Sequence, residues 1–469
     1  MISVISLALQ HRLFMKFTAF WQRVTRKRKN SKTVKNSGTA GSGVGGDLPK
    51  ITPRAEHSIT RNDMSENALK VLYRLKKARY SSYLVGGGVR DLLLGLHPKD
   101  FDVATNATPE QVRKIFGNCR LIGRRFRLAH VHFGREIIEV ATFRAAHDNA
   151  GGEGVTKDGM IVRDNVYGTL EDDAWRRDFT INALYYNISD FSIVDYTDGL
   201  KDIESKTIRI IGDANERLQE DPVRMLRAVR FAAKLDFKIE PSLSDSIKDN
   251  IHLLDGVPAA RLFEEVLKLF LHGHALASYE LLKEYDLLKH LFSQSAKYLD
   301  EAGDRFITQA LINTDLRIKQ KKPIAPAFLY AALLWPAVRH EAEKLKKEDL
   351  SLLQVYQIAG QEVLEKQLKQ ILIPKRFGIP MREIWTMQAR LASIKGKRPL
   401  KLLPVPRFRA SYDFLLLREQ SGEIQLKELC DWWTTIQAVS EEEQLLMCKN
   451  FSKGKAKKKK KPKKINQPE

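Results

Sequence analysis

Glycines and aspartates between positions 84 and 102 could bind a nucleotide and a metal ion. The apolar run Tyr83–Val85 is followed by three glycines, Gly86 to Gly88, whose bare backbone N–H groups could approach phosphate oxygens closely. Asp100 and Asp102 are two residues apart, so on a strand both carboxylates would lie on one face and Phe101 would point into a core. Paired carboxylates are suitable ligands for Mg²⁺. The segment therefore predicts phosphate and metal binding.

Two simpler interpretations compete with this one. A dinucleotide-binding loop also begins with closely spaced glycines, but Arg90 and Asp91 stand where its third glycine should follow. A lone Asp-x-Asp is most often a solvated strand edge. The glycine run upstream and the charged motifs downstream favour the nucleotide site.

A second cluster, Leu170–Leu184, reads LEDDAWRRDFTINAL. Arg176 and Arg177 beside Asp178 would be a poor choice for a core element unless they bind an anion, and guanidinium groups match phosphate oxygens well. The alternative is a capped helix start, with Asp172 or Asp173 near the cap, and a surface salt bridge. We interpret the arginines as ligands of a triphosphate.

A third cluster is EDPVRMLRAVRFAA, Glu220–Ala233. Asp221 is placed to cap a helix that begins at Pro222, and Arg224 and Arg227 are three residues apart on one face of it. A carboxylate can accept from the exocyclic amine of a base, and a guanidinium can donate to a ring nitrogen or carbonyl. We predict base recognition here, against the simpler interpretation of an ordinary amphipathic helix.

His130 and His132 alternate on a predicted strand and share a face. No third metal ligand accompanies them, so we expect a structural or RNA-facing role. Trp432 and Trp433 could stack on bases, but we expect them to be buried in the helical body.

The pattern of elements predicts an α/β head followed by an all-α neck and body. Expected strands include Tyr83–Val85, the Asp-x-Asp segment, His130–Phe133 and Glu136–Phe143, which together form a small mixed sheet. Helices are expected over Ser65–Leu75, over Val89–Leu94 and after Thr108, where Pro109 and Gln111 complete a capping box. From Asp202 to Lys449 apolar residues recur at helical spacing.

The basic residues are concentrated at the ends of this 469-residue chain of formal charge +22. Residues 1–46 hold nine lysines and arginines without an acid, and residues 453–464 hold nine lysines, so the middle carries only about +5. The lysine-rich end cannot bury an apolar face, and we expect it to be disordered and to bind RNA phosphates; a solubility tail is the alternative. We divide the chain into a basic segment and linker at 1–60, a catalytic head at 61–200, a neck for base and RNA binding at 201–275, an RNA-binding body at 276–450 and a disordered tail at 451–469.

The N-terminal apolar run is broken by His11, Arg12 and Lys16, so we expect neither a transmembrane segment nor a secretory signal. Two interpretations stay open: an amphipathic helix that associates peripherally with a membrane or partner, or an upstream start with Met15 as the initiator. Cys119, Cys430 and Cys448 are far apart and indicate neither a disulfide framework nor a zinc site. We expect a cytoplasmic monomer.

Four motifs, taken in order, resemble the class II nucleotidyltransferases of the polymerase β superfamily, which comprise CCA-adding enzymes and bacterial poly(A) polymerases. They are LVGGGVRDLLLG, KDFDVATNATPEQV, RRDFTINAL and EDPVRMLRAVRFAAKL, within about residues 60–275. LIGRRFRLAHVHF at Leu121–Phe133 and the segment Ala259–Glu265 resemble the poly(A) polymerase versions of these regions. We therefore predict a poly(A) polymerase, with a CCA-adding tRNA nucleotidyltransferase and a catalytically silent RNA-binding protein as alternatives.

The resemblance implies attack of an RNA 3′-hydroxyl on the α-phosphate of ATP, without a template and with release of pyrophosphate. Two Mg²⁺ ions would bind Asp100 and Asp102, and a third carboxylate would come from Glu171, Asp173 or Glu139, of which we favour Glu171. It further implies RNA 3′ ends as partners, in mRNA processing and decay, and contact with the RNA-decay machinery. The residues it assigns to the nucleotide are Gly87, Gly88, Arg90, Arg176, Arg177, Asp178, Asp221, Arg224 and Arg227.

Overall fold

The computed structural model describes residues 48–123, 127–145, 156–157, 160–161, 166–394 and 396–457. The chain forms two compact units, Met1–Glu204 and Ser205–Glu469. Residues 1–47, 124–126 of the LIGRRFRLAHVHF segment and 458–469 of the lysine-rich end lie outside the described part, so the predictions made on them are not addressed below.

The first unit is built on one eight-stranded sheet in the order β1-β10-β9-β2-β3-β6-β5-β4. Its neighbouring strands pair antiparallel except β3 and β6, which are parallel, so the predicted mixed sheet is confirmed. In chain order its strands are β1 (Lys50–Thr52), β2 (Ser82–Val85), β3 (Asp102–Thr105), β4 (Cys119–Ile122), β5 (Leu128–Phe133), β6 (Glu136–Thr142), β9 (Leu184–Asn187) and β10 (Ile193–Asp195). A separate pair, β7 (Thr156–Lys157) and β8 (Met160–Ile161), is antiparallel.

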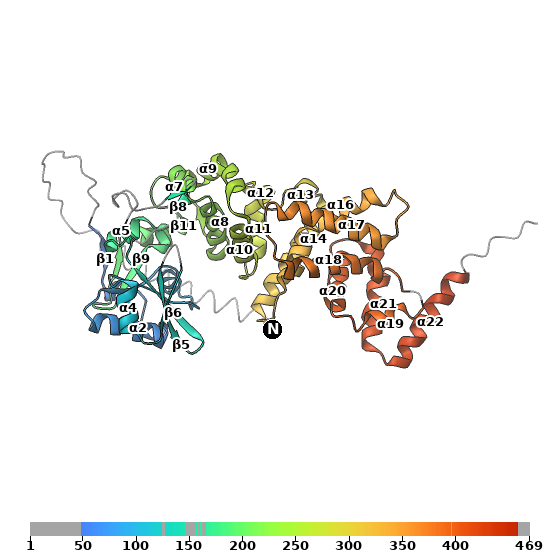
Figure 1. Ribbon diagram of the computed structural model, residues 1–469, viewed down its shortest axis with the longest axis horizontal. Helices are drawn as coiled ribbons and strands as arrows, with labels where there is room; N and C mark the ends of the chain where they lie inside the picture. The colour runs from blue at the N-terminus through green and yellow to red at the C-terminus, as the bar shows by residue number, and fades with distance from the viewer. Residues whose placement is uncertain are drawn as a thin grey trace, which may run out of the picture. The chain divides into compact units, whose positions relative to one another are not determined.

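Five α-helices of this unit are described: α2 (Glu66–Lys77), α3 (Gly87–Leu93), α4 (Pro109–Ile115), α5 (Leu170–Trp175) and α6 (Gly199–Ser205), which leads into the second unit. α2 and α4 pack on one face of the sheet (Figure 1), where Val103, Val131 and Val140 are buried. Thr108 and Gln111 form the predicted capping box at the start of α4, and Ser65 caps α2 by accepting from the backbone N–H of Ala68.

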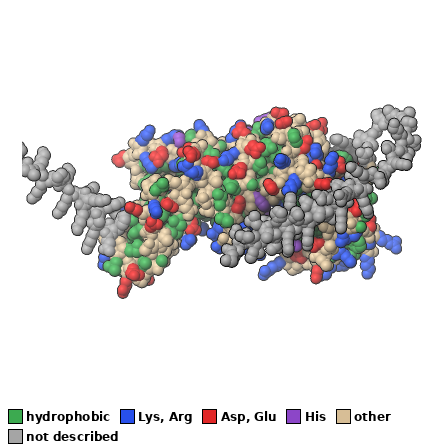
Figure 2. Space-filling model, turned by 180° about the vertical axis from the view of Figure 1, so that it is seen from behind, with side chains coloured by type: hydrophobic (Ala, Val, Ile, Leu, Met, Phe, Trp, Pro, Cys, Tyr) green, Lys and Arg blue, Asp and Glu red, His purple; other side chains and the backbone are tan. Residues whose placement is uncertain are grey.

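The second unit is helical, as the sequence predicts, with one short parallel pair of strands, β11 (Thr207–Ile208) and β12 (Lys238–Ile239). Its helices are α7 (Ala214–Glu220), α8 (Val223–Leu235), α9 (Pro241–Asn250), α10 (Ala259–Phe270), α11 (Ala275–Glu284), α12 (Leu288–Leu291), α13 (Ser293–Lys297), α14 (Glu301–Lys319), α15 (Pro326–Leu333), α16 (Trp335–Leu345), α17 (Leu352–Leu368), α18 (Lys375–Leu391), α19 (Arg398–Leu402), α20 (Phe408–Gln420), α21 (Lys427–Ala438) and α22 (Glu441–Lys457). Acidic and basic side chains are interspersed on the face of these helices seen in Figure 2.

Three sequence predictions concern the tryptophans and the lysine-rich segment near the end of this unit, and the cysteines of both units. Trp433 is fully buried and its indole N–H donates to the Leu391 carbonyl at 3.0 Å, so the prediction of burial is confirmed for this residue, while Trp432 is half-buried. α22 runs to Lys457, which places the first lysines of the segment expected to be disordered in a helix. Cys119, Cys430 and Cys448 are buried free thiols.

Candidate active site

The two aspartates of the Asp-x-Asp motif lie at the start of β3, but only Asp102 belongs to the strand. Asp102 pairs with Val85 at the last register position of β2, and Asp100 precedes the strand, so the expected strand contains only the second of the two aspartates. Phe101 is buried, as expected, and both aspartates are exposed. The motif therefore presents two carboxylates to solvent at one strand end.

Glu139 is the residue that β6 places beside Asp102. Parallel pairing of β3 with β6 sets these two residues opposite each other. Although Asp102 reaches solvent, the surrounding protein desolvates it, and the Glu139 and Asp100 carboxylates repel its charge; Arg177 opposes this shift. The pKa of Asp102 is raised to about 6 as a result. Three carboxylates thus influence one another at this end of the sheet.

The glycine run connects β2 to α3 next to these carboxylates. Gly86 has φ +70°, and a Cβ there would lie 3.4 Å from Arg177 Nη1 and 3.7 Å from the Asn182 carbonyl oxygen. A Cβ on Gly88 would lie 3.7 Å from the Asp100 carbonyl oxygen. α3 begins at Gly87, two residues before the predicted start, so Gly87 and Gly88 form its first turn. The left-handed backbone of Gly86 favours glycine at that position, whereas a Cβ at Gly88 would make only ordinary van der Waals contacts.

Arg90, predicted to contact the nucleotide, is buried, with 2% of its surface exposed. Its Nε and Nη2 donate to Asp91 Oδ1 at 2.9 and 2.6 Å, and Nη1 donates to Asn182 Oδ1 at 2.5 Å. Asn182 also donates to Asp178 Oδ1 at 3.1 Å, and the same oxygen accepts from the Phe179 backbone N–H at 2.8 Å. These bonds tie α3 to the segment after α5, so Arg90 and Asp178 hold the site together in this structure.

Arg177 lies in a network with Asp173 and Tyr185. Asp173 Oδ2 accepts from Arg177 Nη2 at 2.9 Å and from the Tyr185 hydroxyl at 2.7 Å, and Arg177 Nε donates to that hydroxyl oxygen at 2.9 Å. Burial raises the pKa of Asp173, but the Arg177 charge and these hydrogen bonds outweigh it, so the pKa lies below its ordinary value. A quarter of the Arg177 side chain, 24%, is exposed. Arg176 is half-buried at the C-cap of α5.

The three candidates for the third carboxylate are therefore in different surroundings. Glu139 is beside Asp102, Asp173 is buried with Arg177, and Glu171 is in the first turn of α5, where it raises the pKa of Tyr196. The capping-box interpretation of this helix is also correct, with Thr169 and Asp172 as the partners. Sequence favoured Glu171; the geometry favours Glu139.

His130 shares the row of Asp102 and Glu139. The register sets His130 of β5 opposite Glu139, and its Nε2 lies 3.2 Å from Glu139 Oε1. The His130 and His132 rings are 6.3 Å apart. No group of three or more metal-ligating side chains with the spacing of a metal site occurs within the described part of the chain, for these histidines or elsewhere.

The predicted base-recognition residues lie at the α7–α8 junction in the second unit. α8 begins at Val223 with Pro222 as N-cap, one residue later than predicted, and Asp221 is the C-cap of α7. Asp221 Oδ1 still accepts from the Val223 N–H at 3.2 Å, and Oδ2 accepts from Arg261 Nη2 at 2.6 Å. Arg261 was not among the predicted site residues.

Arg224 and Arg227 follow on α8. Arg224 Nη1 donates to Glu220 Oε2 at 2.8 Å and to the Arg217 carbonyl oxygen at 2.5 Å. The Arg227 guanidinium lies 5.3 Å from the centre of the Phe231 ring. The junction is therefore a charged cluster in which one carboxylate, that of Asp221, is oriented by an arginine from α10.

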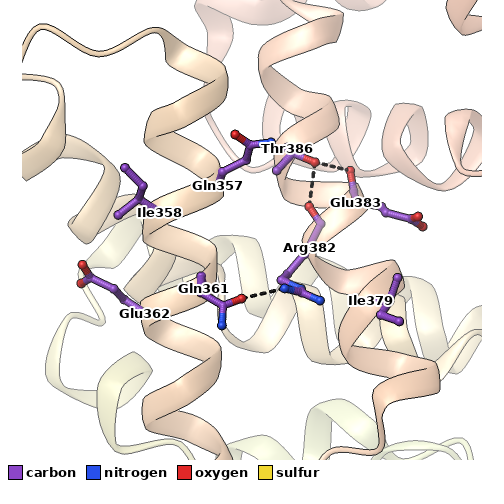
Figure 3. Close-up of a pocket in the computed structure, with 8 residues that line it drawn as sticks. All are labelled: Gln357, Ile358, Gln361, Glu362, Ile379, Arg382, Glu383 and Thr386. Carbon is purple, nitrogen blue, oxygen red and sulfur yellow. Dashed lines mark hydrogen bonds between the residues drawn. The ribbon is translucent and has the colours of Figure 1, made fainter.

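The second unit also has a groove between α17 and α18 (Figure 3). Ile358 and Ile379 form its apolar part, and Arg382 Nη1 donates to Gln361 Oε1 at 2.7 Å across it. None of the predicted site residues lines it.

Comparison with known proteins distinguishes the alternatives. Family models match three segments: "Poly A polymerase head domain" at residues 82–209, "Probable RNA and SrmB-binding site of polymerase A" at 236–299 and "Polymerase A arginine-rich C-terminus" at 348–467. Poly(A) polymerase I of Salmonella typhimurium is 50% identical over 404 residues, covering 84% of this chain and 87% of the relative. The chain belongs to the bacterial poly(A) polymerase I family.

Other matches agree with this placement. Poly(A) polymerase I of Escherichia coli O157:H7 is 51% identical over 401 residues, covering 83% of this chain and 86% of its own length. A CCA-adding enzyme of Lactobacillus helveticus is 36% identical over 225 residues, only 48% of this chain and 55% of the relative. The prediction of a poly(A) polymerase rather than a CCA-adding enzyme is confirmed.

Among solved structures, a Thermotoga maritima CCA-adding enzyme complexed with tRNA superimposes with a TM-score of 0.57. It is 19% identical and covers 85% of this chain and 89% of its own. This member of the poly(A) polymerase family thus shares its fold with a CCA-adding enzyme. No helix in the described residues of this poly(A) polymerase family member has the length and apolarity needed to cross a membrane.

Proposed function

We propose that this protein transfers AMP from ATP to RNA 3′ ends, with Asp100, Asp102 and Glu139 as the catalytic carboxylates. The observation that carries the proposal is the β3–β6 pairing, which sets Glu139 opposite Asp102. The Arg177 charge is also close enough to Asp102 to oppose the rise in the pKa of that carboxyl. In the reaction the RNA 3′-oxygen bonds to the α-phosphorus of ATP, the bond to the bridging oxygen of the β-phosphate breaks, and pyrophosphate leaves with the displaced electrons.

The carboxylates have the donor chemistry that Mg²⁺ requires. Hard oxygen ligands suit this ion. Burial is the main cause of the raised pKa of Asp102, and the smaller contribution, repulsion from the Glu139 and Asp100 carboxylates, is one that a divalent cation would relieve. When bound, two Mg²⁺ ions lower the pKa of the attacking hydroxyl and stabilise the charge of the leaving pyrophosphate. Asp100 and Asp102 would hold them, with Glu139 at the side of Asp102.

Residues around the carboxylates would bind the triphosphate. Arg177 keeps an exposed edge while Asp173 and Tyr185 fix its guanidinium, so it would stay oriented toward an incoming anion. Arg176 and the N–H groups of Gly87 and Gly88 would add further donors. Arg90 would act as a positioning residue through Asn182 rather than as a nucleotide contact.

At the α7–α8 junction, Asp221, Arg224 and Arg227 would select adenine without a template. Arg261 holds one oxygen of Asp221 in place, and a carboxylate fixed in this way can accept from an exocyclic amine in only a narrow range of directions. We further propose that the protein acts as a cytoplasmic monomer that supplies tailed RNA to the decay machinery.

Release of pyrophosphate tests the chemistry. The full chain with ATP, Mg²⁺ and an unstructured RNA should release pyrophosphate, and the Asp100→Ala and Asp102→Ala variants should lose the activity while keeping their circular dichroism spectra. Turnover near that of the unaltered protein in either variant would show that the aspartates are not the metal ligands.

A further inference from the structure

Within the part of the chain that the structure describes, the face of the sheet that carries Asp102 is only partly covered. On β2, β3, β9 and β10 it packs beneath α5, where Ala174 and Leu170 join the cluster around Val85 and Tyr185. On β6, β5 and β4 the same face carries exposed side chains: Ile137 is 40% exposed, Ile122 is 41% exposed and Arg120 is also exposed. We name this open area, formed by Arg120, Ile122, His130, His132 and Ile137, the sheet platform.

The registers show that the platform is continuous with the carboxylates. Asp102 is paired with Glu139, Glu139 with His130, and His130 with Arg120, so the four residues form one row across β3, β6, β5 and β4. Side chains at paired positions point to the same face of a sheet. The neighbouring pair, His132 and Ile137, extends the platform along the strands.

The other face of these strands is occupied. Cys119, Val131 and Ile138 are buried there beneath α4 and α2, so a ligand can approach β4 to β6 only from the platform side. α5 covers the part of the Asp102 face over β2, β3, β9 and β10, so a polymer that lies along this face with its end at Asp102 would extend over the platform.

The side chains of the platform suit single-stranded RNA. Imidazole rings and aliphatic side chains at the surface of a strand can support unstacked bases, as aromatic side chains on sheets do in RNA-binding modules. Arg120 is exposed and forms no ion pair with an acidic side chain in the part of the chain described, so its guanidinium can bind a phosphate. An anionic chain with stackable bases fits this combination, whereas a purely apolar partner would leave Arg120 and the histidines unsatisfied.

We infer that the sheet platform binds the last nucleotides of the RNA whose 3′-hydroxyl is extended, with a base on His132 and a phosphate on Arg120. This inference rests on the proposed function, because it assumes that the 3′ end is delivered to Asp102. The platform holds the end of the substrate beside the reacting carboxylates and does so without reading its sequence, since stacking and phosphate contact are available to every base.

The test measures binding of a 5′-labelled, unstructured RNA to the full chain by fluorescence anisotropy, without ATP. His132→Ala should weaken binding about fivefold or more, whereas His132→Phe, which keeps a ring, should bind like the unaltered protein. Arg120→Ala should weaken binding and reduce the slope of log affinity against log salt by about one phosphate contact. Arg113→Ala is the matched control, because Arg113 is an exposed arginine on α4, on the opposite side of the sheet.

Unaltered affinity in both His132→Ala and Arg120→Ala would overturn the inference, as would an equal loss in Arg113→Ala, which would indicate only a general effect of charge. Asp102→Asn separates this inference from the proposed function. If neither the unaltered protein nor the variant transfers AMP, the proposed function fails; if the unaltered protein transfers AMP and Asp102→Asn does not, while His132→Ala and Arg120→Ala bind RNA normally, only the sheet platform fails.

Discussion

Replacing Glu139 by glutamine should raise the stability of the metal-free protein and lower its activity. Glu139 raises the pKa of Asp102, so removing its charge should lower that pKa from about 6 toward the ordinary value, though not fully, since desolvation is the larger cause. When the pKa of a carboxyl group is higher in the folded protein than in the unfolded protein, the ionised group destabilises the folded state. That penalty is absent below pH 3.8 and is fully present above about pH 6.

The expected size of the effect is small because both carboxylates reach solvent. At pH 7 and without metal, we expect Glu139→Gln to stabilise the head by at most about 1 kcal/mol, which corresponds to a rise in melting temperature of about 1 to 3 °C. At the same time AMP incorporation should fall by about a hundredfold or more, since a charged group at the reacting centre is lost.

Glu171→Gln is the matched control, because Glu171 is a half-buried carboxylate of the same head that lies on α5 near Tyr196. Differential scanning fluorimetry at pH 7 in a chelator and single-nucleotide extension with saturating Mg²⁺ measure the two effects. Near-normal extension by Glu139→Gln together with loss of extension in Glu171→Gln would refute the assignment of the third carboxylate.

Three further predictions concern other parts of the protein. Tyr185→Phe removes a hydrogen bond to the buried Asp173 carboxylate and should lower the free energy of unfolding by about 1.5 to 3 kcal/mol, measured by urea denaturation; an unchanged midpoint would contradict the network. Arg224→Ala should relax the preference for ATP over CTP about tenfold, measured as the ratio of kcat/KM values, and an unchanged ratio would argue against base recognition. Deleting residues 453–469 should weaken RNA binding and flatten its salt dependence, and an unaltered slope would leave the lysine-rich segment without a role in RNA binding.

Local features of the fold were predictable from the sequence because their causes are local. The capping box at Thr108 and Gln111 depends on residues three apart, and Phe101 is buried because it alternates with charged neighbours. The start of α3 was misplaced because glycine is a poor helix former in general, whereas the structure has Gly86 as the N-cap and Gly87 and Gly88 in the first turn.

The proposal of Glu139 as the third carboxylate depends on a contact that the sequence does not display. Glu139 becomes a neighbour of Asp102 only through the parallel pairing of β3 with β6, which joins distant segments after a helix and two strands intervene. Glu171, by contrast, is close to the arginine motif in the sequence, and that proximity favoured it as the third carboxylate. The alternation of Glu139 within a β-rich segment was visible, but its register was not.

The clustering of Asp221 with Arg261 has the same origin. Asp221 and Arg261 are 40 residues apart and meet because α10 packs against α8. The buried Arg90 likewise donates to the side chain of Asn182, which is far away in the sequence. In each case the partner that surrounds the residue came from tertiary packing, which the sequence does not display.

The central claim is that this chain adds adenylate to RNA without a template. The most direct measurement is the length of the product formed on one unstructured RNA with ATP alone and with CTP alone, resolved on a denaturing gel, with Asp102→Asn as the inactive control. We predict long tails from ATP, little or no extension from CTP and none from the variant. Extension limited to one or two nucleotides, or efficient use of CTP, would contradict the claim and indicate a CCA-adding enzyme.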